Sequence, residues 1–199
     1  IVDEVRSDIG SYADLELDVT NQLLLAGAFR YEAYSDFGNT LNGKIAARFK
    51  VNDQLALRAS VSSGFRAPSL AQVYFNSTFT DFVAGQPIDK FIAKNNSPIT
   101  RKLGIPSLKE ETATNISAGF TATPIEGLTA TVDYYYVNIK DRIVLTGAFD
   151  QSDPDIGPDL VALNVGAAQF FTNALDTKTN GGDVILTYAF RMERNHFNL

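Results

Sequence analysis

Residues 54–74 read QLALRASVSSGFRAPSLAQVY, and this stretch decides the fold class. Its first part alternates between apolar and polar side chains without interruption. The apolar set is Leu55, Leu57, Ala59 and Val61, and the polar set is Arg58, Ser60 and Ser62. Successive side chains of a β-strand point to opposite faces, so the pattern predicts a strand with one apolar and one wet face. The alternation ends at Gly64, where we expect the strand to run into a loop.

The same alternation recurs along the chain and predicts about seven strands. They are expected at residues 11–19, 22–31, 41–50, 54–63, 111–122, 128–138 and 170–190, with a turn at 191–195 and a further strand beginning at 196–199. Short connections alternate with longer ones at 32–40, 64–110 and 141–168. Transmembrane β-barrels have short periplasmic turns and longer extracellular loops, so we expect these three connections to be extracellular.

Three short segments carry a family resemblance. Gly64-Phe65-Arg66-Ala67-Pro68-Ser69-Leu70 resembles a segment in the barrel of TonB-dependent outer-membrane receptors. Leu108-Lys109-Glu110-Glu111, with Asn115 and Gly119, is similar to that family's L-K-P-E…N…E-x-G segment, although Glu110 replaces Pro and Ser117 replaces Glu. Asn180-Gly181-Gly182-Asp183-Val184 resembles the family's G-V-E-L strand, with Gly182-Asp183 in place of Val-Glu. The resemblance spans residues 64–184, and the flanking alternation extends it to most of the chain.

The resemblance implies an all-β fold of antiparallel strands, as part of a 22-stranded transmembrane barrel that holds a plug domain. Residues 1–199 are then an internal section of about seven to eight strands, without the plug. Its long extracellular loops are expected at about 64–110 and 141–168. An open sheet leaves two hydrogen-bonding edges, which cannot face lipid. We therefore expect this section, if made alone, to aggregate or to pair edge to edge.

The resemblance also implies a transport receptor in the bacterial outer membrane, not an enzyme. Such a receptor binds a scarce nutrient outside the cell, and the TonB energy-coupling protein drives uptake through the plug. A ferric siderophore is the default ligand, while cobalamin, haem and oligosaccharides stay open. The expected partners are therefore TonB, outer-membrane lipid and an extracellular small molecule.

Composition narrows the function classes. The chain has 199 residues and no Cys, which excludes disulfides and thiolate chemistry. A single His, His196, makes a metal cluster or a Ser-His-Asp triad a poor expectation, and no cofactor is predicted. The net charge of −6 and the scattered Lys and Arg residues argue against nucleic acid as a partner.

The connection at 64–110 is the main candidate for ligand binding because it combines aromatic and cationic side chains. The candidate residues are Arg66, Tyr74, Phe75, Phe79, Phe82, Phe91 and Arg101. Aromatic rings with cations suit an anionic or aromatic ligand, and the rings equally suit a sugar. The alternative is that the rings form a small core of the loop itself. For Arg66 the favoured alternative is a pair with a barrel carboxylate, with Pro68 fixing the exit of the chain from the strand.

Two further clusters have a structural and a functional interpretation. Asp14, Glu16 and Asp18 form a carboxylate row that suits Ca²⁺ or acid–base chemistry. We favour a wall of the barrel lumen, in which the row pairs with Arg30, Lys44, Arg48 and Arg58 on the same side. Tyr134-Tyr135-Tyr136 suits a ligand box, but an aromatic girdle at the membrane surface is favoured.

The main alternative function is a soluble all-β ligand-binding module, either a sandwich or a jelly roll. It predicts that one face of each strand packs into a core and the other meets solvent. A lipid-facing wall instead predicts an apolar middle with aromatic margins, which the sequence favours. An outer-membrane barrel enzyme, the third alternative, lacks a credible catalytic set.

Overall fold

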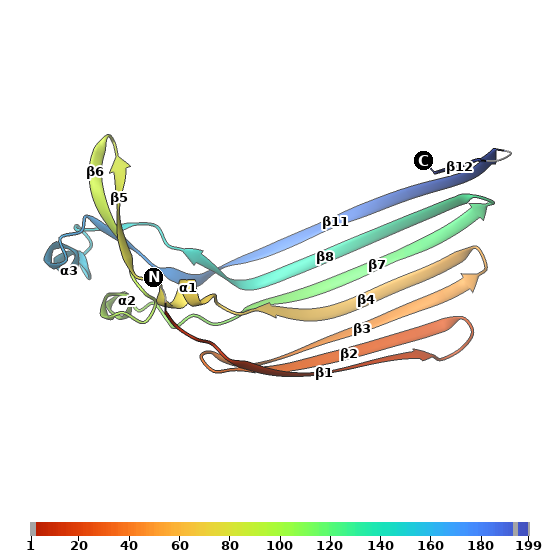
Figure 1. Cartoon of the computed structure of the whole chain (residues 1–199), viewed down its shortest axis with the longest axis horizontal. Helices are drawn as coiled ribbons and strands as arrows, with labels where there is room; N and C mark the ends of the chain where they lie inside the picture. The colour runs from red at the N-terminus through yellow and green to blue at the C-terminus, as the bar shows by residue number, and fades with distance from the viewer. Residues whose placement is uncertain (1–2, 193–194, 199) are drawn as a thin grey trace.

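The structure is a computed structural model that describes residues 3–192 and 195–198. Within these residues eight strands form one antiparallel sheet in the order β1-β2-β3-β4-β7-β8-β11-β12 (Figure 1). They are β1 (Asp8–Asp18), β2 (Leu23–Tyr34), β3 (Gly38–Asn52), β4 (Leu55–Arg66), β7 (Glu111–Ile125), β8 (Leu128–Leu145), β11 (Phe171–Met192) and β12 (Asn195–Asn198). We call this sheet the wall. The turn expected at 191–195 lies partly outside the described residues.

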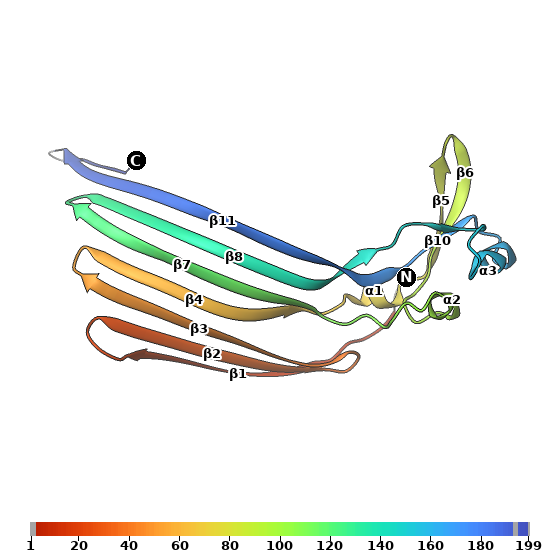
Figure 2. The same ribbon diagram turned by 180° about the vertical axis from the view of Figure 1, so that it is seen from behind.

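The wall is a single curved layer with two different ends (Figures 1 and 2). Short turns join β1 to β2, β3 to β4 and β7 to β8 at one end. The connections between β4 and β7 and between β8 and β11 gather at the other end, which also holds the N-terminus. We call the latter the loop end.

The prediction of a long polar loop at 32–40 is wrong. β2 and β3 stay paired up to Tyr34 opposite Gly38, so that only a tight turn joins them. The side chain of Glu32 explains the extension: its carboxylate accepts hydrogen bonds from Arg30 at 2.6 Å and from the Tyr34 hydroxyl at 3.3 Å. The charged Glu32, which contributed to the prediction of a loop, therefore finds its hydrogen-bond partners on the strand itself. β4 and β8 are likewise longer than expected and end at Arg66 and Leu145.

Strand register divides the wall into two faces, because directly opposed residues of an antiparallel pair share a face. One row across the strands runs Leu15, Gly27, Ile45, Val61, Ile116 and Tyr136. The next row runs Asp14, Ala28, Lys44, Ser62 and Asn115. We call these two sides the apolar face and the polar face. The expected alternation is thus confirmed across the wall.

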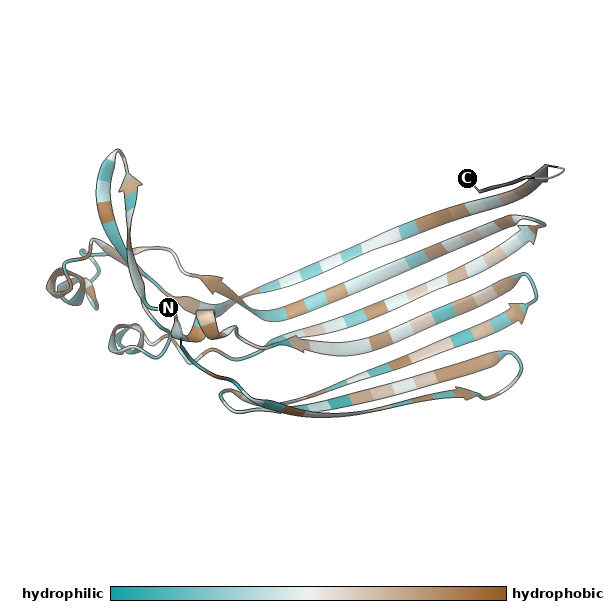
Figure 3. Ribbon diagram, in the orientation of Figure 1, coloured by the Kyte–Doolittle hydropathy of each residue, from teal (hydrophilic) through white to brown (hydrophobic). Residues whose placement is uncertain are grey.

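The apolar face forms a band of limited height. On β8 it extends from Leu128 at the short-turn end to Tyr134 and Tyr136 toward the loop end. These eight steps span about 27 Å along the strand, or about 20 Å of height at the usual tilt of barrel strands. Hydrophobic colour concentrates toward the short-turn end of β8 and β11, and hydrophilic colour increases toward the loop end (Figure 3).

The apolar face is uncovered. Ile45 is 66% exposed and Val184 is 67% exposed, although both lie in the middle of regular strands. In the described residues no second sheet packs over this face, since the remaining four strands form a separate small sheet. The soluble sandwich, which needs a packed core on this face, is therefore wrong for this chain.

Candidate functional site

The two long connections fold together into one unit at the loop end. They contribute the strands β5 (Ser77–Val83), β6 (Gln86–Ile92), β9 (Phe149–Asp150) and β10 (Ala167–Gln169), in the sheet order β5-β6-β10-β9. They also contribute the short helices α1 (Leu70–Tyr74), α2 (Pro98–Lys102) and α3 (Gly157–Ala162). β10 pairs in parallel with β6 of the other connection, with Phe91 opposite Ala168. We call residues 67–110 and 146–170 together the loop unit.

The loop unit has its own hydrophobic core. Its buried members come from both connections and are Ala93, Ile99, Ile156, Leu160, Val165, Ala168 and Phe170. Phe170 is fully buried, and its ring lies 5.8 Å from that of Phe149, measured between centroids. Burial of side chains from both connections makes each one depend on the other. The loop unit is therefore a folded body rather than two free loops.

Asn95 ties this body to the wall. It is 2% exposed, and its amide nitrogen donates to the carbonyl oxygens of Pro106 and Phe171, at 3.1 Å each. Its side-chain oxygen accepts from the backbone N–H of Leu108 at 3.1 Å. Phe171 is the first residue of β11, so one buried amide joins the first connection to the strand that follows the second.

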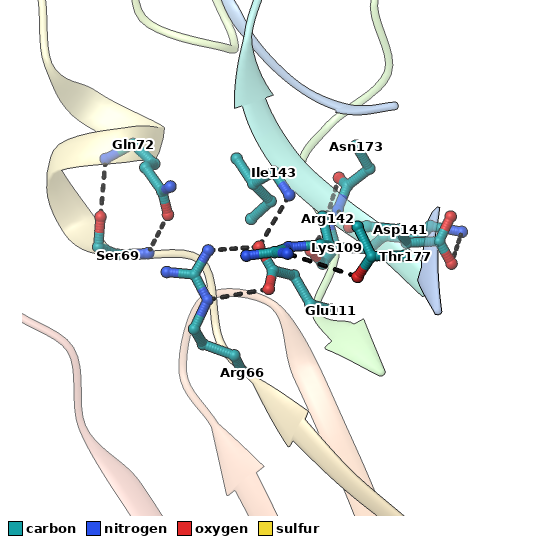
Figure 4. Close-up of polar contacts among 10 residues, drawn as sticks. All are labelled: Arg66, Ser69, Gln72, Lys109, Glu111, Asp141, Arg142, Ile143, Asn173 and Thr177. Atoms are coloured by element: carbon teal, nitrogen blue, oxygen red, sulfur yellow. Dashed lines mark hydrogen bonds and ion pairs between the residues drawn. The ribbon is translucent and has the colours of Figure 1, made fainter. Parts of the chain in front are cut away.

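A second amide, Asn173, repeats this arrangement nearer to the wall (Figure 4). Its nitrogen donates to the carbonyl oxygens of Lys109 at 2.9 Å and Asp141 at 2.6 Å, and its oxygen accepts from the N–H of Lys109 at 3.0 Å. The ammonium of Lys109 also lies 3.0 Å from the Asp141 carboxylate. Asn173 thus joins the ends of β7, β8 and β11, where β11 has an irregular register.

Arg66 and Glu111 complete the junction (Figure 4). Arg66 forms a two-pronged hydrogen-bonded ion pair with Glu111, whose carboxylate also accepts from the N–H of Ile143 at 2.8 Å. Glu111 is buried, and the expected pairing of Arg66 with a barrel carboxylate is confirmed. Pro68, fully buried, follows directly and precedes Ser69, which caps α1 in a reciprocal hydrogen-bond pair with Gln72.

The predicted ligand residues do not form one cluster. Phe79 and Phe82 lie on opposite faces of the β5–β6 hairpin, because they are three residues apart on one strand. Both are exposed, Phe82 to 71%, near the tip of the hairpin. Phe91 packs against the core of the loop unit, which matches the alternative of a self-packed loop. These rings therefore belong to at least two environments.

The other candidates sit on the short helices. Tyr74 ends α1 and is half-buried, and Phe75, at the cap of the helix, is partly exposed. Arg101 lies in the last turn of α2 and is exposed. In the described part of the chain its guanidinium has no hydrogen-bond or ion-pair partner. It is thus a cation that is available to a ligand, unlike Arg66.

A shallow groove of about 550 Å³ lies on the polar face toward the loop end. Its polar lining includes Tyr12, Asp14, Arg30, Asn42, Lys44 and Ser62. Arg30 is held by Glu32, whereas Asp14 and Lys44 face each other across the small side chain of Ala28. The groove therefore offers both signs of charge on the first four strands of the wall.

The carboxylate row of β1 does not form the expected ion pairs. Within the described residues Asp14, Glu16 and Asp18 have no cationic partner within 4 Å. The residues of β2 directly opposite them are Ala28, Ala26 and Leu24, which separate the row from the cations of β3. Arg30 and Arg58 are engaged elsewhere. The row lies at the edge of the wall, on the first strand.

Arg58 instead reaches across a neighbouring strand to Asp133, with its Nε 2.8 Å from Oδ1. Gly119 lies between them in register, opposite both residues. A Cβ at Gly119 would clash with the Asp133 carboxylate and with the carbonyl oxygen of Val132. The missing side chain is therefore what allows the ion pair to cross β7.

Two carboxylates of the loop unit have perturbed acidity. The hydrogen bond from the Lys90 ammonium lowers the pKa of Asp81, and the N–H of Phe82 acts in the same direction. The hydroxyl of Ser152 lowers the pKa of Asp150. Both groups are thus carboxylates at neutral pH. In the described residues no three potential metal ligands gather at one place.

Sequence reasoning missed the residues that join the loop unit to the wall. Glu111 lies in a quoted motif, which could have marked it. Asn95 stands between Lys94 and Asn96 in a polar run, and Asn173 lies in a strand, so neither gives a periodic signal.

No helix in the described part of the chain is long and apolar enough to cross a membrane.

The chain resembles solved receptor structures over nearly its whole length. The siderophore receptor PirA from Pseudomonas aeruginosa matches 98% of this chain with 17% identity and a TM-score of 0.69, which covers 34% of PirA. A variant of the ferric enterobactin receptor PfeA from the same organism matches 93%, with 16% identity and a TM-score of 0.67, over 24% of its length. The FrpB iron transporter from Neisseria meningitidis matches 92%, with 17% identity and a TM-score of 0.55, over 23% of its length. At these identities the likeness shows the fold.

The chain therefore spans between about a quarter and about a third of the length of these proteins. The comparison with curated proteins found no match. A family model described as "TonB dependent receptor-like, beta-barrel" matches residues 2–199. Together with the register, the uncovered apolar face and the loop end, this match shows that the chain belongs to the TonB-dependent receptor β-barrel family.

Proposed function

We propose that this chain supplies part of the barrel wall and one extracellular binding unit of an outer-membrane receptor for a ferric siderophore. Uptake would be energised by the TonB protein, acting through a plug domain of the complete receptor. The observation that carries the proposal is the loop unit itself, a folded body with exposed aromatic and cationic side chains at one end of an apolar band. The similar structures include siderophore receptors, which supports this ligand class.

The apolar band supports a location in the outer membrane. Its height of about 20 Å is close to the roughly 25 Å of known outer-membrane barrels, and tyrosines border it toward the loop end. Long loops lie on the extracellular side of such barrels, so the loop unit would face outward. A barrel wall with no catalytic set among the quoted residues suits a transporter rather than an enzyme.

Within the loop unit, Arg101 and Phe82 are the strongest ligand candidates. Arg101 has no ion-pair partner among the residues that the structure describes, and Phe82 is the most exposed of the predicted rings. Tyr74, Phe75 and Phe79 follow, while Phe91 and Arg66 are held by the core and by Glu111. An anionic ferric siderophore would be attracted by the cation and would stack on the rings.

The test uses the complete receptor in whole cells. Uptake of radioactive iron is measured for a panel of ferric siderophores and haem, alongside labelled cobalamin and an oligosaccharide, in cells with and without TonB. We expect uptake of one ferric siderophore only when TonB is present. Uptake of cobalamin or a sugar instead would overturn the ligand class, and uptake that does not need TonB would overturn the mechanism.

A further inference from the structure

Charged side chains of the wall are confined almost entirely to the polar face. The register places Asp14, Arg30, Lys44, Arg58 and Asp133 on that face. On β1, β2, β3, β4 and β7, all fully described, the positions of the apolar face carry no charged residue. This is the pattern expected where the apolar face meets hydrocarbon, since a charge on the lipid side destabilises a barrel most strongly near the midplane.

Lys140 and Lys178 depart from this pattern. Lys178 lies opposite Asn138, which lies opposite Thr114, and Lys140 lies opposite Thr112. Asn138 and Lys140 follow Tyr134 and Tyr136 at alternate positions of β8, so both lysines belong to the apolar face. Both are exposed. In the described part of the chain neither ammonium has a hydrogen-bond or ion-pair partner.

The depth of the two lysines is set by the tyrosines. Lys178 lies level with Asn138, which is two residues beyond Tyr136 toward the loop end, and Lys140 is two residues further. Two residues correspond to about 7 Å along a strand, so both ammonium groups sit just above the apolar band. Lipid phosphates lie at this depth, and long lysine side chains extend their charge toward them.

The geometry suits a phosphate between the two side chains. Lys140 and Lys178 are diagonal neighbours on paired strands, a relation that places Cβ atoms about 7–8 Å apart. Of the carboxylates beside them, Asp141 pairs with Lys109, and Asp176 accepts the N–H of Asp141 at 2.9 Å but keeps its negative charge. Within the described residues neither lysine forms an ion pair with Asp176, so the two lysines and this carboxylate together leave a net positive charge.

We propose that Lys140 and Lys178 bind the phosphate groups of a phosphorylated lipid in the leaflet on the loop side. The proposal rests on the outer-membrane location proposed above, but not on the identity of the transported ligand. The lipid headgroup, rather than a soluble anion, is the occupant because the lysines stand on the lipid-facing side and directly above the apolar band. A juxtamembrane lysine near an anionic surface contributes about 1 kcal/mol, so the pair should matter measurably.

The test measures lipid binding by the complete, detergent-purified receptor. Native mass spectrometry titrates lipid A carrying its phosphates, and lipid A from which they were removed, against wild type and the variant K140Q/K178Q. We expect the variant to bind the phosphorylated lipid roughly ten- to thirty-fold more weakly, and the dephosphorylated lipid as wild type does. The charge-retaining variant K140R/K178R should bind like wild type.

The matched control is K44Q/K50Q, which removes two lysines from the polar face of β3. The proposal would be overturned by an equal loss in this control, by unchanged binding of the phosphorylated lipid to K140Q/K178Q, or by wild type that binds the dephosphorylated lipid as tightly as the phosphorylated one. Heat-modifiable migration in gel electrophoresis confirms that each variant keeps its barrel. Iron uptake is measured in parallel: normal uptake with unchanged lipid binding rejects the lipid site alone, and weakened lipid binding without any siderophore uptake rejects the transport proposal alone.

Discussion

The wall and the loop unit are both β-structure, yet they are stabilised in opposite ways. Every strand of the wall pairs with its neighbours, but its large apolar side chains stay uncovered, as Ile45 and Val184 show. The loop unit has short strands, but it encloses Phe170, Ile156 and Leu160 completely. The difference teaches that the wall has strand pairing without a core over its apolar face, whereas the loop unit carries its own core.

The variant Phe170→Ala gives the strongest test of whether the loop unit and the wall are stabilised independently. Loss of a fully buried ring should destabilise the loop unit by about 3–5 kcal/mol and leave the wall intact. Hydrogen exchange read by mass spectrometry should show faster exchange in residues 67–110 and 146–170 only. Val184→Ala, on the uncovered face, is the control and should change neither region. Exchange that accelerates equally in the wall would show that the two regions form one cooperative body.

Asn95→Ala tests the connection between the regions. It removes three hydrogen bonds and leaves the buried N–H of Leu108 without its acceptor, a loss of about 2–4 kcal/mol in local stability. Limited proteolysis should then cut the loop unit faster in the folded receptor. Asn96→Ala, an exposed neighbour, is the matched control. Equal protease resistance of both variants would mean that the core alone holds the loop unit in place.

Gly119→Ala tests the wall without touching the loop unit. The new methyl group meets the Asp133 carboxylate and the Val132 carbonyl, so we expect a loss of about 1–3 kcal/mol in unfolding by urea. Gly64→Ala on the adjacent strand has open space around its Cβ and serves as control. If both variants unfold at the same urea concentration, the crossing of Arg58 to Asp133 contributes nothing.

The variants Arg66→Met and Glu111→Gln compare the contributions of the two partners of one ion pair. Removal of Arg66 leaves a buried carboxylate without its cation and should cost about 1–2 kcal/mol, a value reduced because the Arg66 side chain is 55% exposed. Glu111→Gln keeps an acceptor for the N–H of Ile143 and should cost less. Urea unfolding of the two purified receptors gives the order directly, and the reverse order would contradict this assignment.

The smallest effect concerns acidity in the loop unit. The pKa of Asp81 is lowered by Lys90, so the pair stabilises the hairpin above the unfolded pKa of an aspartate. That contribution is lost as the pH falls through the lowered pKa of the folded state. Hairpin exchange, corrected for the intrinsic rate, should therefore rise in acid for wild type but not for Asp81→Asn. Identical acid profiles would show that the pair is too exposed to matter.

The sequence predicted the wall well and the loop unit poorly, for one physical reason. A strand with two different faces leaves a period of two in its own residues, as Leu55 to Val61 show, so local reading suffices. The loop unit depends on contacts such as Phe91 with Ala168, which no local pattern encodes. A charged residue also led to a wrong prediction. Glu32 favoured a loop in the sequence because its hydrogen bonds with Arg30 and Tyr34 form only when the strand is in place.

The candidate site shows the same limit. Arg66 was expected to pair with a carboxylate, and the structure shows this pair. It could be predicted because both partners lie in recognisable motifs. Asn95 was missed because an asparagine in a polar run carries no sign of burial, and Asn173 because a single amide in a strand gives no periodic signal. Phe79 and Phe82 were predicted as ligand residues, and this stays a prediction, but only the register of the hairpin separates them onto two faces.

The parallel pairing of β6 with β10 has a consequence for the order of folding. The two strands are separated in the chain by the whole β7–β8 hairpin, so their contact closes a long loop of chain and carries a large entropic cost. That cost falls once β7 and β8 are paired and bring the ends of both connections together. We therefore expect the wall to form first during biogenesis, and the loop unit to be the last part of the chain to acquire its structure.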